Sequence, residues 1–228
     1  MGNKFLLEGL VKEGERLGIL RSQKRALIRE YLQSKIIYYL YGLKKSQLLS
    51  FIGGTSLRLL RGLDRFSEDL DFDNLGLTFT EVKTLFEKVR RKLDKEGFLT
   101  EYEFKKTNHS GSGAIKFIDL LFQLQISSHL QEKLRVKIDY TVPKVKPPTE
   151  VLVLSRFGLV QSLVTNTEAF ILSQKMQAIL TRKDLQPRDF YDVVWFLSRG
   201  VKPSPLLYKD MKVKNGKELA SSTLLKNI

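Results

Sequence analysis

The sequence predicts an α+β fold with a mixed sheet and helices, followed by a mainly helical C-terminal part. Short apolar runs bounded by glycine or proline alternate with helical patterns as far as about residue 142. The segment DLDFD within this part alternates polar and apolar residues, which is typical of a strand. From about Thr165 the pattern is helical. We therefore expect a first domain at residues 1–145 and a second at 146–228, ending in a basic tail.

The first expected elements lead into a glycine turn. Residues 22–43 carry apolar side chains at helical spacing, with Ser22 as a candidate N-cap and Gly42 as a stop. The segment LLSFIGG predicts a short buried strand that ends at its glycines. The segment TSLRLLRGL predicts a helix that starts on this turn, and DLDFD predicts the strand that follows it.

The rest of the first domain reads as a helix and three strands. Residues 80–97 predict a helix with Thr80 as its N-cap and an apolar face. Strands are expected at 98–107 and 113–125, joined by a hairpin loop, NHSGSG. A further strand, KLRVKIDYTV, ends at Pro143.

Two helices are expected in the C-terminal part. The segment NTEAFILSQKMQAILTR has apolar residues at helical spacing. In PRDFYDVVWFLSRG, Pro187 suits the first turn of a helix and Gly200 suits its end.

Composition narrows the possible functions. The 228 residues carry a formal net charge of +14 and no cysteine. The missing thiols exclude disulfides and cysteine nucleophiles, and they fit a cytoplasmic protein. No apolar stretch is long enough to span a bilayer. The excess of lysine and arginine favours a polyanionic partner, above all a nucleic acid.

The strand DLDFD places three carboxylates on one face. Side chains two residues apart on a strand share a face, about 7 Å from one another. Asp69, Asp71 and Asp73 should therefore point one way, with Leu70 and Phe72 in the core. An acidic surface is the ordinary reading of such a strand. A divalent cation would remove the repulsion between the carboxylates, and oxygen ligands favour Mg²⁺ or Mn²⁺.

The glycine turn ahead of this strand adds a second signal. At Gly53 and Gly54, backbone N–H groups can approach a phosphate closely, and Thr55 or Ser56 can add a hydroxyl. The helix that starts there offers its positive end. A phosphate cradle beside a metal-binding strand is the pairing that phosphoryl transfer requires.

These motifs resemble the signature of the abortive-infection AbiEii/AbiGii (MenT-like) family, nucleotidyltransferases of the DNA polymerase β type, many of them toxins of toxin–antitoxin pairs. Its pattern is a G-G-T/S turn, then R-x-S-x-D-[IL]-D, then a helix with a lysine, then R-D-x-x-D. The chain matches these motifs in order at Gly53, Gly54 and Thr55; Arg65, Ser67, Asp69, Leu70 and Asp71; Lys175; and Arg188, Asp189 and Asp192.

The resemblance implies roles for several of the matched positions. Asp69 and Asp71 would bind the metals, and Lys175 would contact the triphosphate of an NTP. Asp189 would complete the site or position Lys175. The phosphates of the nucleotide would lie on Gly53, Gly54, Thr55 and Ser56.

The resemblance also implies a third carboxylate from a nearby strand. Asp139 in RVKIDY is the candidate metal ligand, because it lies mid-strand between two apolar residues. Asp119 in KFIDLLF has a similar local sequence, so the choice between the two stays open at this stage.

The sequence thus predicts a metal-dependent nucleotidyltransferase, the toxin of a type IV-like toxin–antitoxin system. It would transfer a nucleotidyl group from an NTP to RNA, with the tRNA 3′ end implied by the resemblance and an antitoxin as a possible partner. The alternatives are nucleotidylation of a protein or a small molecule, and a non-catalytic module that binds RNA or an antitoxin.

Overall fold

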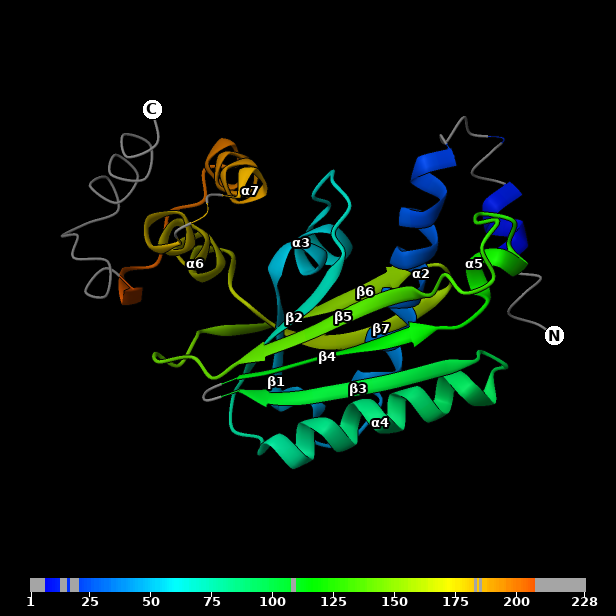
Figure 1. Ribbon diagram of the computed structural model, residues 1–228. Helices are drawn as coiled ribbons and strands as arrows, with labels where there is room; N and C mark the ends of the chain where they lie inside the picture. The colour runs from blue at the N-terminus through cyan, green and yellow to red at the C-terminus, as the bar shows by residue number, and fades with distance from the viewer. Residues whose placement is uncertain are drawn as a thin grey trace. The chain divides into compact units, whose positions relative to one another are not determined.

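The computed structural model describes residues 7–12, 16, 21–107, 110–182, 184 and 186–207 (Figure 1). The chain divides into two compact units. Unit 1 comprises residues 1–142 and 151–164, and unit 2 comprises residues 143–150 and 165–228. The domain boundary expected at residue 145 stays a prediction. Most of the expected basic tail lies outside the described residues.

Within the described residues, unit 1 is built around a five-stranded sheet in the order β1-β2-β5-β4-β3 (Figure 1). The strands β2 and β5 run parallel, and the other neighbours run antiparallel. The prediction of a mixed sheet is therefore confirmed. The strands are β1 (Leu49–Ile52), β2 (Asp69–Asn74), β3 (Thr100–Thr107), β4 (Ser110–Phe117) and β5 (Leu134–Thr141).

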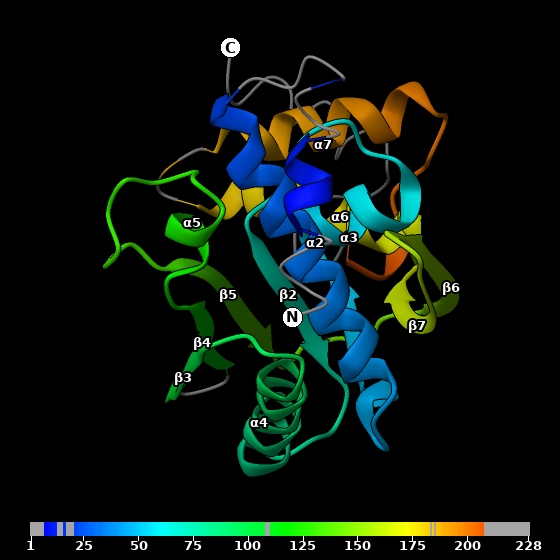
Figure 2. The ribbon, with the colours of Figure 1, turned by 90° about the vertical axis from the view of Figure 1, so that its right-hand side faces the viewer.

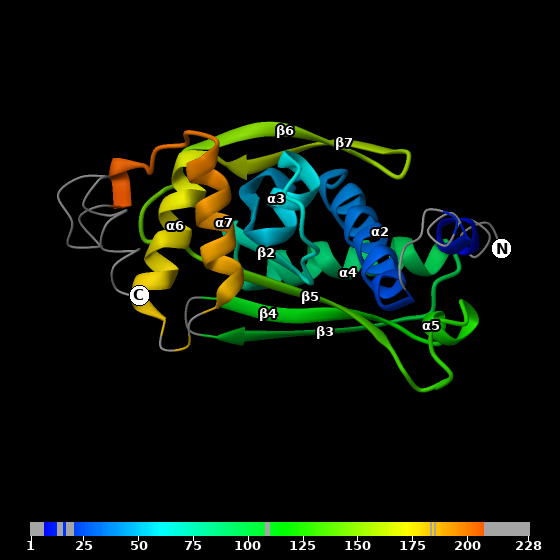
Figure 3. The same cartoon turned by 90° about the horizontal axis from the view of Figure 1, so that it is seen from above.

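Two long helices cover the apolar face of this sheet. These are α2 (Arg21–Tyr41) and α4 (Phe79–Lys95), whose ribbons are seen in Figures 2 and 3. Their buried side chains join those of the strands in one core. Alternate residues of β5 are buried there, namely Leu134, Val136, Ile138 and Tyr140. Because a strand alternates its side chains between two faces, the polar side chains of β2 and β5 lie on the opposite face.

The start of α4 differs from the prediction. The helix begins at Phe79, and its N-cap is Thr78 rather than Thr80. The Glu81 backbone N–H donates to the Thr78 hydroxyl at 3.3 Å, and the Thr78 N–H donates to the Glu81 carboxylate at 2.9 Å. This capping box requires Glu three residues after the cap, and only Thr78 has one. A hydrogen bond from Lys45 is the main reason that the pKa of Glu81 falls to about 2.

The region after β4 is also corrected. The strand expected at 113–125 ends at Phe117, and a single helical turn, α5 (Leu120–Gln123), follows. Asp119 takes a left-handed backbone conformation with φ 57°, which a continuing strand cannot accommodate. The run of apolar residues in this segment therefore serves the start of a helix.

A hairpin occupies the stretch where the sequence indicated only a boundary. It consists of β6 (Thr149–Arg156) and β7 (Leu159–Asn166), joined through Phe157 and Gly158. Both linking residues have positive φ, at 53° and 74°, as a tight two-residue hairpin turn requires. The Tyr41 hydroxyl of α2 donates to the Val164 carbonyl at 3.1 Å and so links β7 to α2.

In unit 2, α6 (Glu168–Thr181) and α7 (Pro187–Ser198) pack against each other. Pro187 lies in the first turn of α7, as predicted, where its missing N–H costs no helical hydrogen bond. The buried apolar side chains of the two helices are Phe170, Ile171, Leu172, Met176, Ile179, Val193 and Phe196. Two short 3₁₀ turns are also present, η1 (Ser46–Leu48) in unit 1 and η2 (Pro205–Leu207) in unit 2.

Among the described residues, no helix combines the length and the apolar character that a membrane span requires.

The two threonines at the start of α4 can be tested as a matched pair. Thr78→Ala removes the capping hydroxyl and should lower the free energy of unfolding by about 1 kcal/mol. Thr80→Ala changes an exposed threonine inside the helix and should change it by no more than about 0.5 kcal/mol. Urea unfolding of both variants measures the difference, and equal losses would contradict the capping box.

Candidate active site

The carboxylates of β2 fall into two groups by exposure. Asp69 and Asp71 are partly exposed, whereas Asp73 is 1% exposed. The Thr141 hydroxyl donates to Asp73 at 3.3 Å. Leu70 and Phe72 between them lie in the core. The two partly exposed carboxylates are therefore the ones that can face a ligand, and Asp73 serves the packing of the sheet.

Asp139 lies directly beside this pair. In the parallel pairing of β2 with β5, Asp139 is the partner of Asp71. Paired positions on neighbouring strands lie about 5 Å apart and share a face of the sheet. Asp119 lies two residues beyond the far end of β4, where Phe117 pairs with Leu134. Of the two candidates for a third carboxylate, the structure brings Asp139 next to Asp71, and its role as a metal ligand stays a prediction.

A lysine lies among these carboxylates. The Lys137 Nζ is 2.6 Å from the Asp139 Oδ2, and Lys137 is the partner of Asp69 across the two strands. The hydrogen bond to Asp139 is the main cause of a raised pKa of Lys137, and the charges of Asp69 and Asp71 act in the same direction. The sequence analysis did not select Lys137. Lys137 could have been predicted from its position two residues before Asp139, because residues at this spacing share a face of the strand.

The donor chemistry fits a hard divalent cation. Asp69, Asp71 and Asp139 offer oxygen ligands from adjacent positions of two strands. As these side chains stand, the described residues contain no group of three carboxylate, histidine or cysteine side chains placed to hold an ion. Ion binding would therefore require the three carboxylate groups to move closer together. Rotation about their side-chain bonds can bring about this movement.

The glycine turn lies in close contact with one of these carboxylates. Gly53 begins α3 (Gly53–Arg61) with φ 76°, a conformation that favours glycine. A Cβ at Gly53 would lie 2.9 Å from both the Cβ and the Cγ of Asp71. A Cβ at Gly54 would lie 2.6 Å from the Arg65 guanidinium and 2.9 Å from the Ser67 hydroxyl. The two glycines therefore allow the turn to contact Asp71 on one side and the Arg65 loop on the other.

The hydroxyls next to the glycines serve the fold. The Thr55 hydroxyl donates to the Asp69 carbonyl at 2.6 Å, and the Ser56 hydroxyl donates to the Gly53 carbonyl at 2.9 Å. Both residues are buried. Both hydroxyls thus donate to backbone carbonyls, and the expected role of Thr55 and Ser56 in phosphate binding stays a prediction. The start of α3 has no side-chain cap, so its first backbone N–H groups are the groups suited to an anion.

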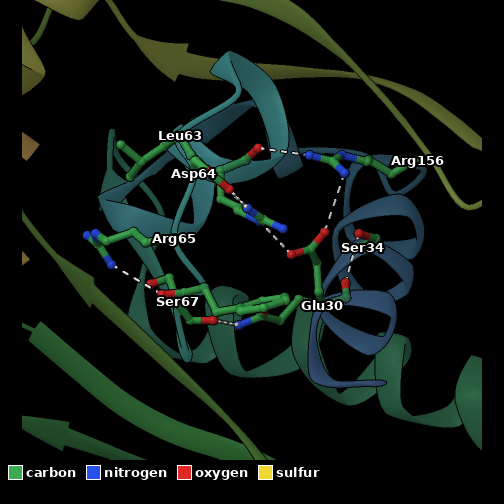
Figure 4. Close-up of polar contacts among 10 residues, drawn as sticks. Glu30, Ser34, Leu63, Asp64, Arg65, Ser67 and Arg156 are labelled. Atoms are coloured by element: carbon green, nitrogen blue, oxygen red, sulfur yellow. Dashed lines mark hydrogen bonds and ion pairs between the residues drawn. The ribbon is translucent and has the colours of Figure 1, made fainter. Parts of the chain in front are cut away.

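The loop that carries Arg65 and Ser67 is hydrogen-bonded to α2. Gln33 donates to the Ser67 carbonyl at 3.0 Å. Buried Glu30 binds Arg58 of α3 at 2.7 Å and Arg156 of β6 at 3.5 Å (Figure 4). This network joins α2, α3 and the β6–β7 hairpin, and Gln33 connects α2 to the loop that contacts Gly54.

Unit 2 holds a second cluster of a lysine and carboxylates. The Lys175 Nζ of α6 lies 2.8 Å from Asp189 and 2.9 Å from Asp192, both on α7. Arg182 also binds Asp189. The side chains of the two aspartates are 2% and 0% exposed. Asp189 thus contacts Lys175, as its predicted positioning role requires. Asp192, which the sequence analysis gave no role, makes a second contact that the R-D-x-x-D spacing could have indicated.

The fold of this chain is similar to that of known structures. The sequence of the chain is 21% identical to that of JHP933 from Helicobacter pylori, and the two structures match with a TM-score of 0.53 over 76% of this chain and 66% of that one. A second structure, a putative nucleotidyltransferase from H. pylori, is 22% identical, with a TM-score of 0.53 over 76% and 68% of the two chains. MenT4, a nucleotidyltransferase toxin from Mycobacterium tuberculosis H37Rv, is 20% identical, with a TM-score of 0.56 over 86% and 64%. The chain thus spans about two thirds of the length of these proteins.

The mixed-sheet core that carries the glycine turn and the paired aspartates is thus similar in fold to these structures. Residues 38–224, well over half of the chain, match the family described as the nucleotidyl transferase AbiEii toxin of type IV toxin–antitoxin systems. The chain belongs to this family. No curated protein sequence matches the chain.

The tight contact between Gly53 and Asp71 can be separated from backbone strain. Gly62 has the same φ, 77°, but a Cβ there would meet nothing within 4 Å. Gly62→Ala should therefore cost only the strain of a left-handed alanine, roughly 1–2 kcal/mol. Gly53→Ala adds the collision with Asp71 and should cost about 1–3 kcal/mol more.

Urea unfolding of the two variants measures this difference. Equal losses at the two positions would show that Asp71 moves aside without cost.

Proposed function

We propose that this chain is a metal-dependent nucleotidyltransferase that transfers a nucleotidyl group from an NTP to RNA. The observation that carries the proposal is the alignment of Asp139 with Asp71 on adjacent parallel strands, with Gly53 in contact with the Asp71 side chain. Membership of the AbiEii family supports the same activity. A glycine turn at the side of a carboxylate cluster brings phosphate-binding N–H groups and metal-binding oxygens into one place.

Each group has a proposed role. Asp69, Asp71 and Asp139 would hold Mg²⁺ or Mn²⁺, which when bound neutralises phosphate charge and polarises the attacking hydroxyl. The backbone N–H groups at Gly53 and Gly54 would bind the phosphates of the NTP. Lys175 would contact the triphosphate, as the family resemblance implies; its ammonium is paired with Asp189 and Asp192 within unit 2.

The proposed reaction is a displacement at the α-phosphorus of the NTP. The hydroxyl oxygen of the acceptor forms a bond to this phosphorus, and the bond between the α-phosphorus and the bridging oxygen breaks. Pyrophosphate leaves with that electron pair, and the hydroxyl proton is lost to solvent. The protein contributes position and charge, because such a step requires little covalent work from its side chains.

The charge of the chain favours RNA as the acceptor. A net charge of +14 suits a polyanion, and RNA and NTPs are both available in the cytoplasm. The tRNA 3′ end is the acceptor that the family resemblance suggests. The type IV family supports a toxin role with a cognate antitoxin as partner. A basic surface gives no reason for a small-molecule acceptor.

Labelled NTPs, Mg²⁺ and total tRNA provide the direct test. The wild-type chain should label the RNA, and Asp71→Asn and Asp139→Asn should each lower the rate about 100-fold or more. A loss of several kcal/mol of charge stabilisation corresponds to such a factor. Asp119→Asn is the matched control and should stay within about threefold of wild type, because Asp119 lies at the other end of the sheet.

The outcomes separate the alternatives. Equal losses in the Asp119 and Asp139 variants would remove the basis for the proposed carboxylate set. Label on protein instead of RNA would indicate protein nucleotidylation. RNA binding without label in wild type, unchanged by Asp71→Asn, would indicate a binding module.

Lys175 offers a separate kinetic test. Lys175→Met removes the proposed triphosphate contact and should raise the KM for the NTP about tenfold or more. Arg182→Gln is the control, because Arg182 also binds Asp189 but is 47% exposed. It should change KM less than about threefold. Thermal unfolding verifies that both variants are folded, and an unchanged KM in Lys175→Met would contradict the triphosphate contact.

A further inference from the structure

The cluster on β2 and β5 already contains a cation that belongs to the protein. Lys137 reaches the Asp139 carboxylate at 2.6 Å. Its partner across the strands is Asp69, so it lies next to two of the three proposed metal ligands. Lys137 therefore supplies positive charge where a metal would supply it.

The neighbouring basic residues on the same face have other partners. Arg135, two residues earlier on β5, binds Glu103 of β3 at 3.3 Å. Lys116 of β4 binds the same Glu103 at 3.0 Å. Lys137 thus differs from these residues, because its ion pair is made with a carboxylate of the candidate site.

We propose that Lys137 is the resident cation of the carboxylate cluster and competes with the divalent metal for Asp139. The inference rests on the proposed function, because it assumes that Asp139 is a metal ligand. An ammonium at 2.6 Å from one Asp139 oxygen would lie within a few ångström of a metal ion bound by the same carboxylate, and the two cations would repel each other. Metal binding is therefore favoured when Lys137 turns away.

The exposure of the pair makes such an exchange feasible. The side chain of Lys137 is 42% exposed and that of Asp139 is 27% exposed. A long, half-exposed lysine can rotate into solvent at small cost, because an ion pair at this exposure contributes little net stability. Lys137 therefore sets the metal affinity of the site. It lowers that affinity by repulsion and protects the carboxylates from mutual repulsion while no metal is present.

Removing the charge of Lys137 tests this role through metal binding rather than activity. Lys137→Met should bind Mn²⁺ about tenfold more tightly than wild type, measured by the EPR signal of free Mn²⁺ or by calorimetry. Lys137→Arg keeps the charge and should stay within about threefold of wild type. Lys116→Met removes a lysine of the same face that pairs with Glu103, and it should also leave the affinity within about threefold.

A second readout follows from linkage. Mn²⁺ should raise the melting temperature of Lys137→Met by more than it raises that of wild type. If Lys137→Met fails to fold, Lys137→Gln provides the same neutral position with a polar end.

The outcomes distinguish this inference from the proposed function. Equal Mn²⁺ affinity in wild type and in the neutral variants would overturn the role of Lys137 and leave the metal site standing. Weaker binding in the neutral variants would do the same, since it would make Lys137 a support for the metal. Absence of Mn²⁺ binding to wild type, under conditions in which the chain is folded, would contradict the proposed metal site and this inference together.

Discussion

The parallel pairing of β2 with β5 is the contact on which the rest of the candidate site depends. It places Asp139 beside Asp71 and Lys137 beside Asp69. A one-residue slip of either strand would turn its side chains to the other face of the sheet. The buried alternate residues of both strands prevent that slip, because it would expose Leu70, Phe72 and the apolar residues of β5. The core therefore fixes the register, and the register determines which charges meet.

The position of the glycine turn follows from the same pairing. The strand β1 leads directly into the turn and pairs antiparallel with β2, so that Ile52 is the partner of Asp71. The next residue, Gly53, therefore emerges against the Asp71 side chain, where any Cβ would collide. The Thr55 hydroxyl adds a link from the helix to the Asp69 carbonyl. The glycine requirement is thus a consequence of the sheet, and it explains why the turn and the acids occur together in the sequence.

Local patterns in the sequence predicted much of the fold. The alternation in DLDFD and the apolar stripe of α4 identified their elements, because burial on one face leaves a regular period in the sequence. The cap of α4 was misplaced by two residues, since both Thr78 and Thr80 suit an N-cap and only Glu81 distinguishes them. The β6–β7 hairpin was missed because its turn, Phe157 and Gly158, lacks the usual asparagine or aspartate before the glycine.

The site was less accessible to sequence reasoning, because it depends on pairings between distant segments. Asp119 and Asp139 look alike in their local sequences, and only the strand register separates them. Thr55 and Ser56 have the right chemistry for a phosphate, and their local sequence does not indicate that their hydroxyls also donate to backbone carbonyls. The ion-pair partner of Lys175 lies on another helix, whereas Lys137 forms its ion pair with Asp139 of its own strand.

Each unit places a lysine against aspartates, but the two arrangements differ in burial. Lys175 is 15% exposed and its partners are almost fully buried, so removing it would leave charge in a region of low dielectric constant. Lys137 and Asp139 are both far more exposed, and water can replace either partner of that pair. Burial therefore fixes Lys175 in place, whereas Lys137 can exchange with another cation. The same two residue types thus provide a permanent positive charge in unit 2 and a replaceable one in unit 1.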